Sequence, residues 1–212
     1  MMVGVLLAAG CGTRFGAHKL LHPLPALRGE GASPRGANHL ADGATIAEQA
    51  AHNLITALPR SVAVVRPGDL ALRDLLTGLG LCVVECVKST QGMGASIACG
   101  VLATPDADGW VIALADMPWI RPQTIYTVAH QLRTGAGIVA PQYQGKRGHP
   151  VGFAAKFKMR LSALNLDTGA RDVIEAEREH LTLSITHDAG VLLDVDVPAD
   201  AQQGFQFHIN GH

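Results

Sequence analysis

Short apolar runs alternate along this chain with longer stretches in which apolar residues recur every three or four positions. The first pattern predicts strands and the second predicts helices. The predicted strands are Val3–Leu7, Val62–Val65, Leu81–Glu85, Trp110–Leu114, Gly137–Ala140, Leu181–Thr186 and Val191–Val195. The predicted helices are Thr45–Leu58, Leu70–Leu79, Gly94–Leu102, Pro122–Thr134, Ala155–Leu164, Ala170–Glu179 and Pro198–Gln203. This alternation indicates an α/β fold, a Rossmann-like three-layer sandwich with a mostly parallel sheet.

Helix-start signals support these boundaries. Thr45 followed by Glu48 forms a capping-box pattern, and Pro122 stands where the first turn of a helix tolerates proline. In a parallel sheet, ligands bind beyond the carboxyl ends of the strands. The loops after Leu7, Leu114 and Ala140 are therefore expected to share one edge of the sheet.

The length of 212 residues suits a single domain spanning 1–212. The segment 28–43 is rich in Gly, has no aromatic residue and has little apolar content, and it is expected to be a mobile surface loop, or alternatively a lid over the site. The net charge of -1 gives no reason to expect nucleic acid or a membrane as a partner. No apolar run is long enough for a membrane span, and no secretory leader is apparent, which together suggest a cytoplasmic protein.

The four cysteines contain no C-x-x-C pair, so we expect buried free thiols at Cys82 and Cys86 and not a metal site. The ten histidines likewise form no metal-ligand pattern such as H-E-x-x-H.

The loop after the first strand carries the strongest functional signal. Gly10, Gly12 and Gly16 allow a close approach of backbone N–H groups to a phosphate, and Arg14 and Lys19 supply positive charge. The spacing excludes a Walker A loop and has one residue too many for a dinucleotide fingerprint. The alternative is an ordinary turn between a strand and a helix. We interpret the loop as a nucleoside triphosphate site.

Two further positions suggest a divalent cation. Asp116 stands at the end of an apolar strand, where a carboxylate is well placed for Mg²⁺. Asp194 and Asp196 alternate with apolar residues, which predicts one shared strand face. Asp196 is the favoured second ligand, although the pattern does not separate it from Asp194. A helix cap at Asp116 and a solvated strand end at the second pair are the structural alternatives.

Three other stretches suggest ligand contacts. Ser96 lies at the start of a helix after a Gly-Met-Gly turn, where a hydroxyl can face a base or ribose. His149 and Arg171 lie in turn-rich segments with further cations and are candidates for holding an anionic second substrate. Helix capping and solvated loops are the alternatives for these three.

Together these motifs resemble the MobA-like nucleotidyltransferase family, and within it the branch of molybdenum cofactor cytidylyltransferases. The resemblance spans roughly 3–200. It is carried by the Leu7-Ala8-Ala9-Gly10 loop, the Gly92–Ser96 turn, the Leu114–Pro118 strand end, Gly148-His149-Pro150, Asp167–Arg171 and Asp194–Asp200. The sequence departs from the family pattern in the longer 28–43 segment, at Val197 and at Asp167-Thr168.

The resemblance implies a fold of the nucleotide-diphospho-sugar transferase type and a reaction in which CTP and Mo-molybdopterin give molybdopterin cytosine dinucleotide and pyrophosphate. It implies catalytic roles for Arg14, Lys19 and Asp116, with Mg²⁺ at Asp116 and Asp196. The implied nucleotide-binding residues are Leu7, Ala8, Ala9, Gly10, Gly12, Arg14, Lys19, Ser96 and Asp116. His149 and Arg171 would bind the acceptor. A transient contact with a molybdenum hydroxylase or its chaperone is also implied.

Several other functions remain open from the sequence. They are guanylyl transfer to the same cofactor, cytidylyl or uridylyl transfer to a sugar or alcohol phosphate, and a non-catalytic molybdenum cofactor chaperone. The resemblance implies cytidine over guanosine, because guanylyl-transferring relatives tend to carry Gly where this chain has Ala9; physically, a methyl group there narrows the space beside the base. An NAD(P)-dependent oxidoreductase is disfavoured by the glycine spacing.

Overall fold

The computed structural model describes residues 1–10, 15, 18–25, 43–165 and 167–202. The strands are β1 Met2–Leu7, β2 Ser61–Val65, β3 Cys82–Glu85, β4 Gly109–Leu114, β5 Ile138–Tyr143, β6 Lys146–Arg147, β7 Val151–Ala154 and β8 Leu181–Ile185. The α-helices are α1 Ile46–Ala57, α2 Leu70–Gly78, α3 Met93–Leu102, α4 Pro122–Arg133, α5 Lys158–Ser162 and α6 Arg171–Ala176. The 3-10 helices are η1 Lys19–Leu21, η2 Ser89–Gln91, η3 Ala155–Phe157, η4 Arg178–His180 and η5 Ala189–Leu192.

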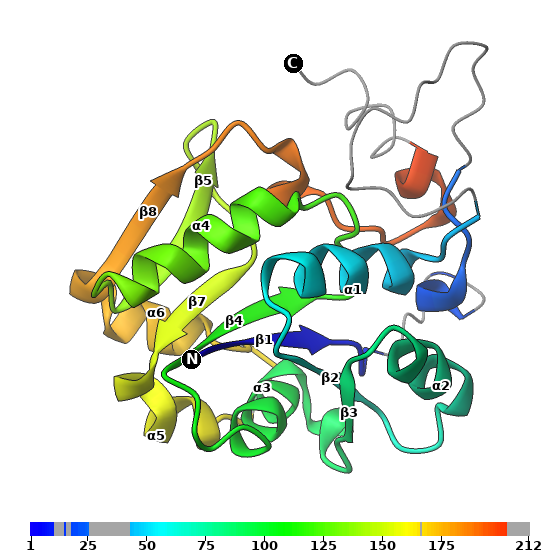
Figure 1. Ribbon diagram of the computed structural model, residues 1–212, viewed down its shortest axis with the longest axis horizontal. Helices are drawn as coiled ribbons and strands as arrows, with labels where there is room; N and C mark the ends of the chain where they lie inside the picture. The colour runs from blue at the N-terminus through cyan, green and yellow to red at the C-terminus, as the bar shows by residue number, and fades with distance from the viewer. Residues whose placement is uncertain (11–14, 16–17, 26–42, 166, 203–212) are drawn as a thin grey trace.

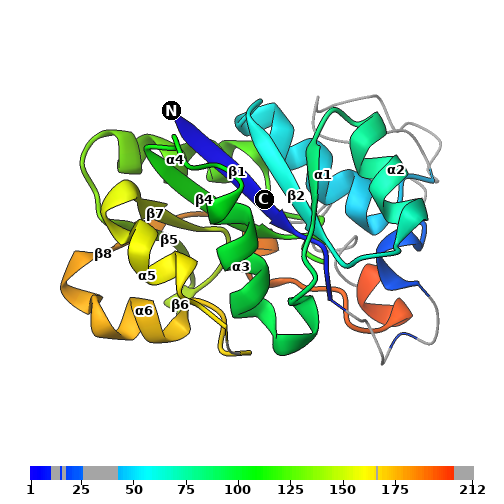
Figure 2. The ribbon, with the colours of Figure 1, turned by 90° about the horizontal axis from the view of Figure 1, so that it is seen from below.

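The eight strands form one mixed sheet in the order β3-β2-β1-β4-β7-β5-β6, with β8 paired to β5. The β1–β2, β2–β3, β1–β4 and β5–β8 pairs are parallel, whereas β7 runs antiparallel to both β4 and β5. Helices α1 and α4 cover one face of the sheet, and α3 and α5 cover the other (Figures 1 and 2). The predicted α/β class with a mostly parallel sheet is confirmed.

Two apolar cores lie on the two faces of the sheet. Leu6 and Val111 point into the core beneath α1 and α4, and Val5 and Trp110 point into the core beneath α3 and α5. Successive residues of a strand point to opposite faces of the sheet. Because both faces are covered here, both sets are apolar, and the central strands appear in the sequence as unbroken apolar runs. Trp110 is fully buried and donates its indole N–H to Thr104 Oγ1 at 2.9 Å.

Most predicted elements are confirmed within a few residues. The capping box is present, since Thr45 accepts from the Glu48 N–H and the Glu48 carboxylate accepts from the Thr45 N–H. Pro122 occupies the first turn of α4. The predicted helix 155–164 is divided into η3 and α5, and the predicted helix 170–179 into α6 and η4. Residues 198–202 are helical.

The predicted strand Val191–Val195 is wrong, because its first residues complete the 3-10 helix η5. The buried Asp188 carboxylate accepts hydrogen bonds from the N–H groups of Arg121 and Gly190 and from the Thr124 hydroxyl. These bonds turn the chain at the start of η5 and hold it against the beginning of α4. A long-range polar contact of this kind overrides the local apolar pattern.

The strand β7 was not predicted, because its segment reads as a hairpin or loop. Gly152 lies in its centre, and glycine is depleted in strands. A Cβ atom there would lie 2.7 Å from Leu132 Cδ1 and 2.8 Å from Val128 Cγ1 of α4. The glycine therefore lets α4 pack closely on the sheet.

The buried-thiol expectation is confirmed for Cys86 and wrong for Cys82, which is exposed. Cys82 begins β3, an edge strand of the sheet whose residues are all exposed or only partly buried. Within the described ranges, no helix has the length and apolar character needed to cross a membrane. The predicted loop 28–43 lies outside the described residues except for Gly43.

The packing of α3 on the sheet can be tested at Gly100. A Cβ atom at Gly100 would lie 2.5 Å from Val5 Cγ1 and 3.1 Å from Val64 Cγ2. We expect Gly100→Ala to lower the free energy of unfolding by about 1–3 kcal/mol through overpacking. Chemical denaturation measures this value. Gly78→Ala is the matched control, because nothing lies within 4 Å of its Cβ position. Equal stability of the two variants would contradict the packing argument.

Candidate active site

A pocket of about 320 Å³ lies beyond the carboxyl ends of β1 and β4. Six of the predicted site residues line it, namely Leu7, Ala9, Gly10, Lys19, Ser96 and Asp116. They come from the end of β1, the 3-10 helix η1, the first turn of α3 and the residue pair after β4. The topology thus brings these four segments, which span positions 7 to 116, to one edge of the sheet, as expected for a doubly wound sheet.

The charged centre of this site is Lys19. Its Nζ atom lies 2.8 Å from Asp116 Oδ2 and 3.3 Å from Asp196 Oδ1. The Lys19 side chain is only 10% exposed, whereas those of Asp116 and Asp196 are 27% and 49% exposed. Two carboxylates converging on one cation in a partly buried position form a place where positive charge is strongly favoured.

The charges also shift the pKa values of the groups around them. Burial lowers the pKa of Lys19, but the hydrogen bonds and charges of Asp116 and Asp196 outweigh it, so the net shift is upward. Burial raises the pKa of Asp194, and the nearby Asp196 and Asp116 charges raise it further. The site is therefore rich in negative charge, and the Lys19 ammonium offsets part of it.

The backbone ties the two carboxylates together. The Val195 N–H donates to the Asp116 carbonyl at 2.9 Å, so the C-terminal segment is fixed beside the end of β4. The Asp200 carboxylate then accepts from the N–H groups of Asp196 and Val197, both at 2.8 Å. Asp196 thus hydrogen-bonds to Lys19, whereas the Asp194 side chain is exposed. The predicted choice of Asp196 over Asp194 is consistent with this geometry.

A second charge cluster fixes the start of η1, next to Lys19. His18 Nε2 lies 3.0 and 2.8 Å from the two oxygens of Asp69, and Arg66 Nε donates to the same carboxylate at 3.2 Å. The Asp69 side chain is 6% exposed and also caps α2 by accepting from the Leu72 N–H. Sequence reasoning missed this cluster, since its members lie 51 residues apart.

His149 lies next to the site but does not line the pocket. Its N–H donates to the Val191 carbonyl at 2.9 Å, which holds the hairpin against η5. Burial lowers the pKa of His149, Asp116 raises it and Arg147 lowers it, with a net downward shift from 6.5. Its Nδ1 atom is buried and has no hydrogen-bond partner among the described residues. The downward pKa shift disfavours the charged form of His149, and its buried Nδ1 atom is not exposed to the pocket.

The predicted acceptor residue Arg171 is exposed at the first position of α6. The same loop reaches the pocket through Asp167, which lines it. Gly169 packs against Met93, since a Cβ atom there would lie 3.0 Å from Met93 Sδ. The segment that carries Arg171 therefore borders the pocket at the start of α3.

Not every predicted residue contributes to the pocket. Ala8 is 2% exposed and belongs to the core beneath α1, and its N–H donates to the Val64 carbonyl at 2.8 Å. Gly12 and Arg14 lie outside the described residues. Ser89 and Thr90 line the pocket and were not predicted. In the sequence these two hydroxyl residues lie just before the Gly-Met-Gly turn, separated from it by one residue, and this closeness is the signal that could have identified them.

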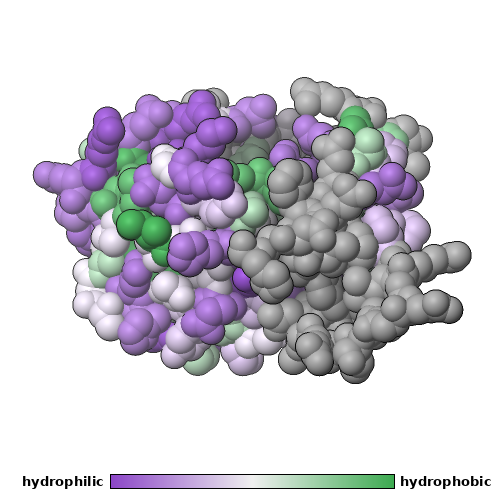
Figure 3. Space-filling view, turned by 90° about the horizontal axis from the view of Figure 1, so that it is seen from above, coloured by the Kyte–Doolittle hydropathy of each residue, from purple (hydrophilic) through white to green (hydrophobic). Residues whose placement is uncertain are grey.

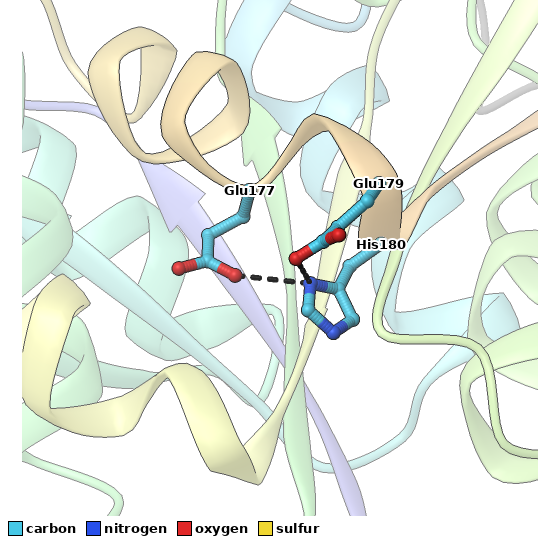
Figure 4. A group of neighbouring side chains, drawn as sticks. All are labelled: Glu177, Glu179 and His180. Atoms are coloured by element: carbon cyan, nitrogen blue, oxygen red, sulfur yellow. Dashed lines mark ion pairs between the residues drawn. The ribbon is translucent and has the colours of Figure 1, made fainter.

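Among the described residues, one group offers three ligand atoms within 4.8 Å of one another: Glu177, Glu179 and His180 (Figure 4). One Glu177 oxygen lies 2.7 Å from Arg160 Nη2, and the other lies 2.9 Å from His180 Nδ1. Both oxygens of the most buried member are therefore already paired. The arrangement is an ion-pair network that fixes the turn before β8.

Comparisons with known proteins identify a family match and solved structures with a similar fold. Residues 4–182 match the MobA-like NTP transferase domain family. The solved structure of Rv0371c from Mycobacterium tuberculosis H37Rv is 24% identical, with a TM-score of 0.74 over 97% of each chain. A second structure of that protein, a complex with manganese, is 22% identical and has a TM-score of 0.71 over 97% of this chain and 98% of that one.

Two further structures share the architecture. A nucleotidyl transferase from Methanothermobacter thermautotrophicus is 19% identical, with a TM-score of 0.78 over 100% of this chain and 99% of that one. Molybdopterin-guanine dinucleotide biosynthesis protein A from Archaeoglobus fulgidus is 17% identical, with a TM-score of 0.63 over 98% of each chain. A comparison with curated protein sequences gave no match. The family match covers most of the sequence and includes β1, β4 and the pocket between them, and the chain therefore belongs to the MobA-like NTP transferase family.

Proposed function

We propose that this protein transfers CMP from CTP to Mo-molybdopterin and releases pyrophosphate, giving molybdopterin cytosine dinucleotide. The observation that carries the proposal is the Lys19 ammonium held between Asp116 and Asp196 beside a pocket of about 320 Å³. A nucleoside triphosphate needs both a cavity for its base and concentrated cations for its phosphates. Membership of the MobA-like NTP transferase family supports the same class of reaction.

The donor set fits a divalent cation. Asp116 and Asp196 already share one positive group, the Lys19 ammonium, which stands in for a metal ion. Carboxylate oxygens are the ligands that Mg²⁺ prefers. We assign Mg²⁺ to these two residues, where it would neutralise charge on the triphosphate. The manganese complex of the Rv0371c structure supports a divalent ion in this fold.

Lys19 then acts on the phosphates. Lys19 lines the pocket, so its ammonium would lie near the α-phosphate and offset the charge that builds up there in the transition state. Gly10 lines the pocket and begins the loop that carries Gly12 and Arg14. We assign the β- and γ-phosphates to the backbone N–H groups of that loop and to Arg14.

The pocket walls favour a small base. Leu7 and Ala9 contribute apolar surface, and Ser96, Ser89 and Thr90 contribute hydroxyls that can bond to a base edge or ribose. The Ala9 methyl group narrows the space available, which favours a pyrimidine over a purine. A one-carbon difference is worth only about 1–3 kcal/mol, so the preference for CTP is moderate.

The acceptor is assigned to the side of the site that carries His149 and Arg171. A terminal phosphate oxygen of the acceptor attacks the α-phosphorus of CTP, and the bond from the α-phosphorus to the bridging oxygen breaks as pyrophosphate leaves. The chain needs no covalent nucleophile, because positioning and charge stabilisation carry such reactions. The structural likeness to the molybdopterin-guanine dinucleotide protein supports a pterin acceptor. A cytoplasmic location and a transient contact with a molybdenum hydroxylase or its chaperone stay predictions.

The base and the acceptor are tested in one assay. Purified protein with Mg²⁺ and Mo-molybdopterin should release pyrophosphate with CTP and much less with GTP, and mass analysis should show the cytosine dinucleotide. Release with GTP alone would overturn the base assignment. Nucleotide binding without release would point to another phosphorylated acceptor or to a cofactor chaperone.

The metal assignment is tested at Asp116. We expect Asp116→Ala to lower pyrophosphate release at least about 100-fold, because the variant removes charge that holds the metal at the phosphates. Asp74→Ala is the control, since Asp74 is exposed on α2 and pairs with its neighbour Arg73. Denaturation curves establish that both variants fold. Near-normal turnover of Asp116→Ala would refute the assignment.

The role of Ala9 is tested by the ratio of kcat/KM for CTP to kcat/KM for GTP. Ala9→Gly should shift this ratio toward GTP by about tenfold, because the variant widens the pocket by one methyl group. Ala8→Gly should leave the ratio unchanged, since Ala8 points into the core and not into the pocket. A shift of equal size in both variants would show that backbone freedom and not space beside the base sets the preference.

A further inference from the structure

The strand β8 forms one edge of the sheet. It pairs with β5 on one side, and none of the described strands pairs with it on the other. Its side chains are mostly uncovered, with Leu183 42% and Ile185 83% exposed. Apolar surface is visible on the side of the molecule where α4, β5 and β8 lie (Figure 3).

The pairing of β8 with β5 determines which backbone N–H and C=O groups lie on the free edge of β8. The Thr186 N–H donates to the Gln142 carbonyl on β5. Because successive residues of a strand point their N–H and C=O groups to opposite sides, Thr182 and Ser184 also face β5. The N–H and C=O groups of Leu181, Leu183 and Ile185 therefore point away from the sheet. The same three residues share one side-chain face, while Ser184 faces α4 and accepts from Gln131 Nε2 at 3.0 Å.

The β8 edge lacks the features that normally prevent an edge strand from pairing with another chain. Edge strands usually carry charged residues, proline or a bulge that prevents pairing with another chain. The sequence of β8 is Leu-Thr-Leu-Ser-Ile, with neither a charge nor a proline. At the opposite edge of the sheet, β3 carries Glu85 within 3.9 Å of Arg73. The contrast marks β8 as the edge that accepts a partner.

We propose that a second copy of this chain pairs with β8 in antiparallel register about a two-fold axis at Leu183. In that register Leu183 faces its own copy, and Leu181 of one copy faces Ile185 of the other. All three are residues whose backbone groups point outward, so the edges are self-complementary in hydrogen bonding. Their side chains form one apolar strip of six residues. An isologous contact of this kind closes at two copies and does not propagate.

The residues at the two ends of β8 favour an antiparallel arrangement. Glu179 lies in η4 before the strand and His187 lies after it, and a two-fold axis at Leu183 brings the end of β8 next to Glu179 in one copy toward the end next to His187 in the other. Glu179 is 83% exposed, and His187 is exposed. A carboxylate can accept a hydrogen bond from an imidazole, whereas a parallel arrangement would bring the two Glu179 ends together.

The residues on both sides of β8 are fixed by other contacts. The turn before β8 is fixed by the ion pairs of Glu177 with Arg160 and His180 (Figure 4). The residues after β8 are fixed by the buried Asp188. A preformed edge loses little conformational freedom on pairing, which favours association. Five paired residues form a small interface, so the dimer is expected to be weak and dependent on concentration.

Sedimentation velocity over a hundredfold range of protein concentration tests the proposal, in reducing buffer because Cys82 is exposed. The wild-type protein should pass from monomer to dimer. Leu183→Lys and Leu183→Glu should each be monomeric throughout, because each sets two like charges face to face. An equimolar mixture of the two variants should form a dimer again, since opposite charges then meet at the axis.

Leu102→Lys is the control, because Leu102 is a comparably exposed leucine at the end of α3. It should dimerise like the wild type. Recovery of dimer in the mixture also shows that both variants fold. A wild-type protein that stays monomeric would overturn the proposal, and so would charged variants that dimerise alone. A mixture that stays monomeric would overturn the axis at Leu183.

Discussion

The site depends on one electrostatic constraint, the convergence of Asp116 and Asp196 on a single ammonium group. Carboxylates repel each other when they are brought together in a partly buried place, so the arrangement requires a cation between them. In this chain the cation comes from Lys19, which lies 97 residues from Asp116 and 177 from Asp196. The contacts of Lys19 with the two carboxylates thus link the first, middle and last parts of the chain across the edge of the sheet.

Much of the surrounding structure keeps these three groups in place. The backbone bond from Val195 to Asp116 fixes the last segment beside β4, and the Asp200 carboxylate orients the turn at Asp196. The cluster of His18, Asp69 and Arg66 fixes the start of η1 against α2. These supporting contacts are made by the backbone or by buried side chains. One cation can therefore replace another at the carboxylates without a change in the position of the surrounding segments.

The elements that the sequence predicts well are those specified by local pattern. The apolar runs of β1 and β4 place Leu7 and Asp116 at strand ends, and the capping signal at Thr45 sets the start of α1. The family motifs predict Lys19 and Ser96, which both line the pocket. Their chemical roles are not tested by the geometry and stay predictions.

The parts that the sequence does not predict are decided by contacts between distant residues. Asp188 draws the chain into η5 where an apolar alternation suggests a strand, and so Asp194 and Asp196 do not share a strand face. The glycine at 152 does not predict a strand locally, and β7 is explained only by the close packing of α4 against that glycine. Ser89 and Thr90 reach the pocket only because η2 folds back toward α3. No local periodicity encodes any of these.

The reversed direction of β7 has a consequence for how the two halves of the site vary. A parallel strand meets the ligand edge at its end, whereas β7, running the other way, meets it at its beginning, where His149 lies. The hairpin through β6 therefore leaves that edge and returns to it without passing through β1 or β4. Residues can be inserted or removed in this hairpin without changing the register of β1 and β4, whose last residues, Leu7 and Leu114, line the pocket. The reversed strand thereby lets the length of the side of the site that begins at His149 change independently of the side that holds Lys19 and Asp116.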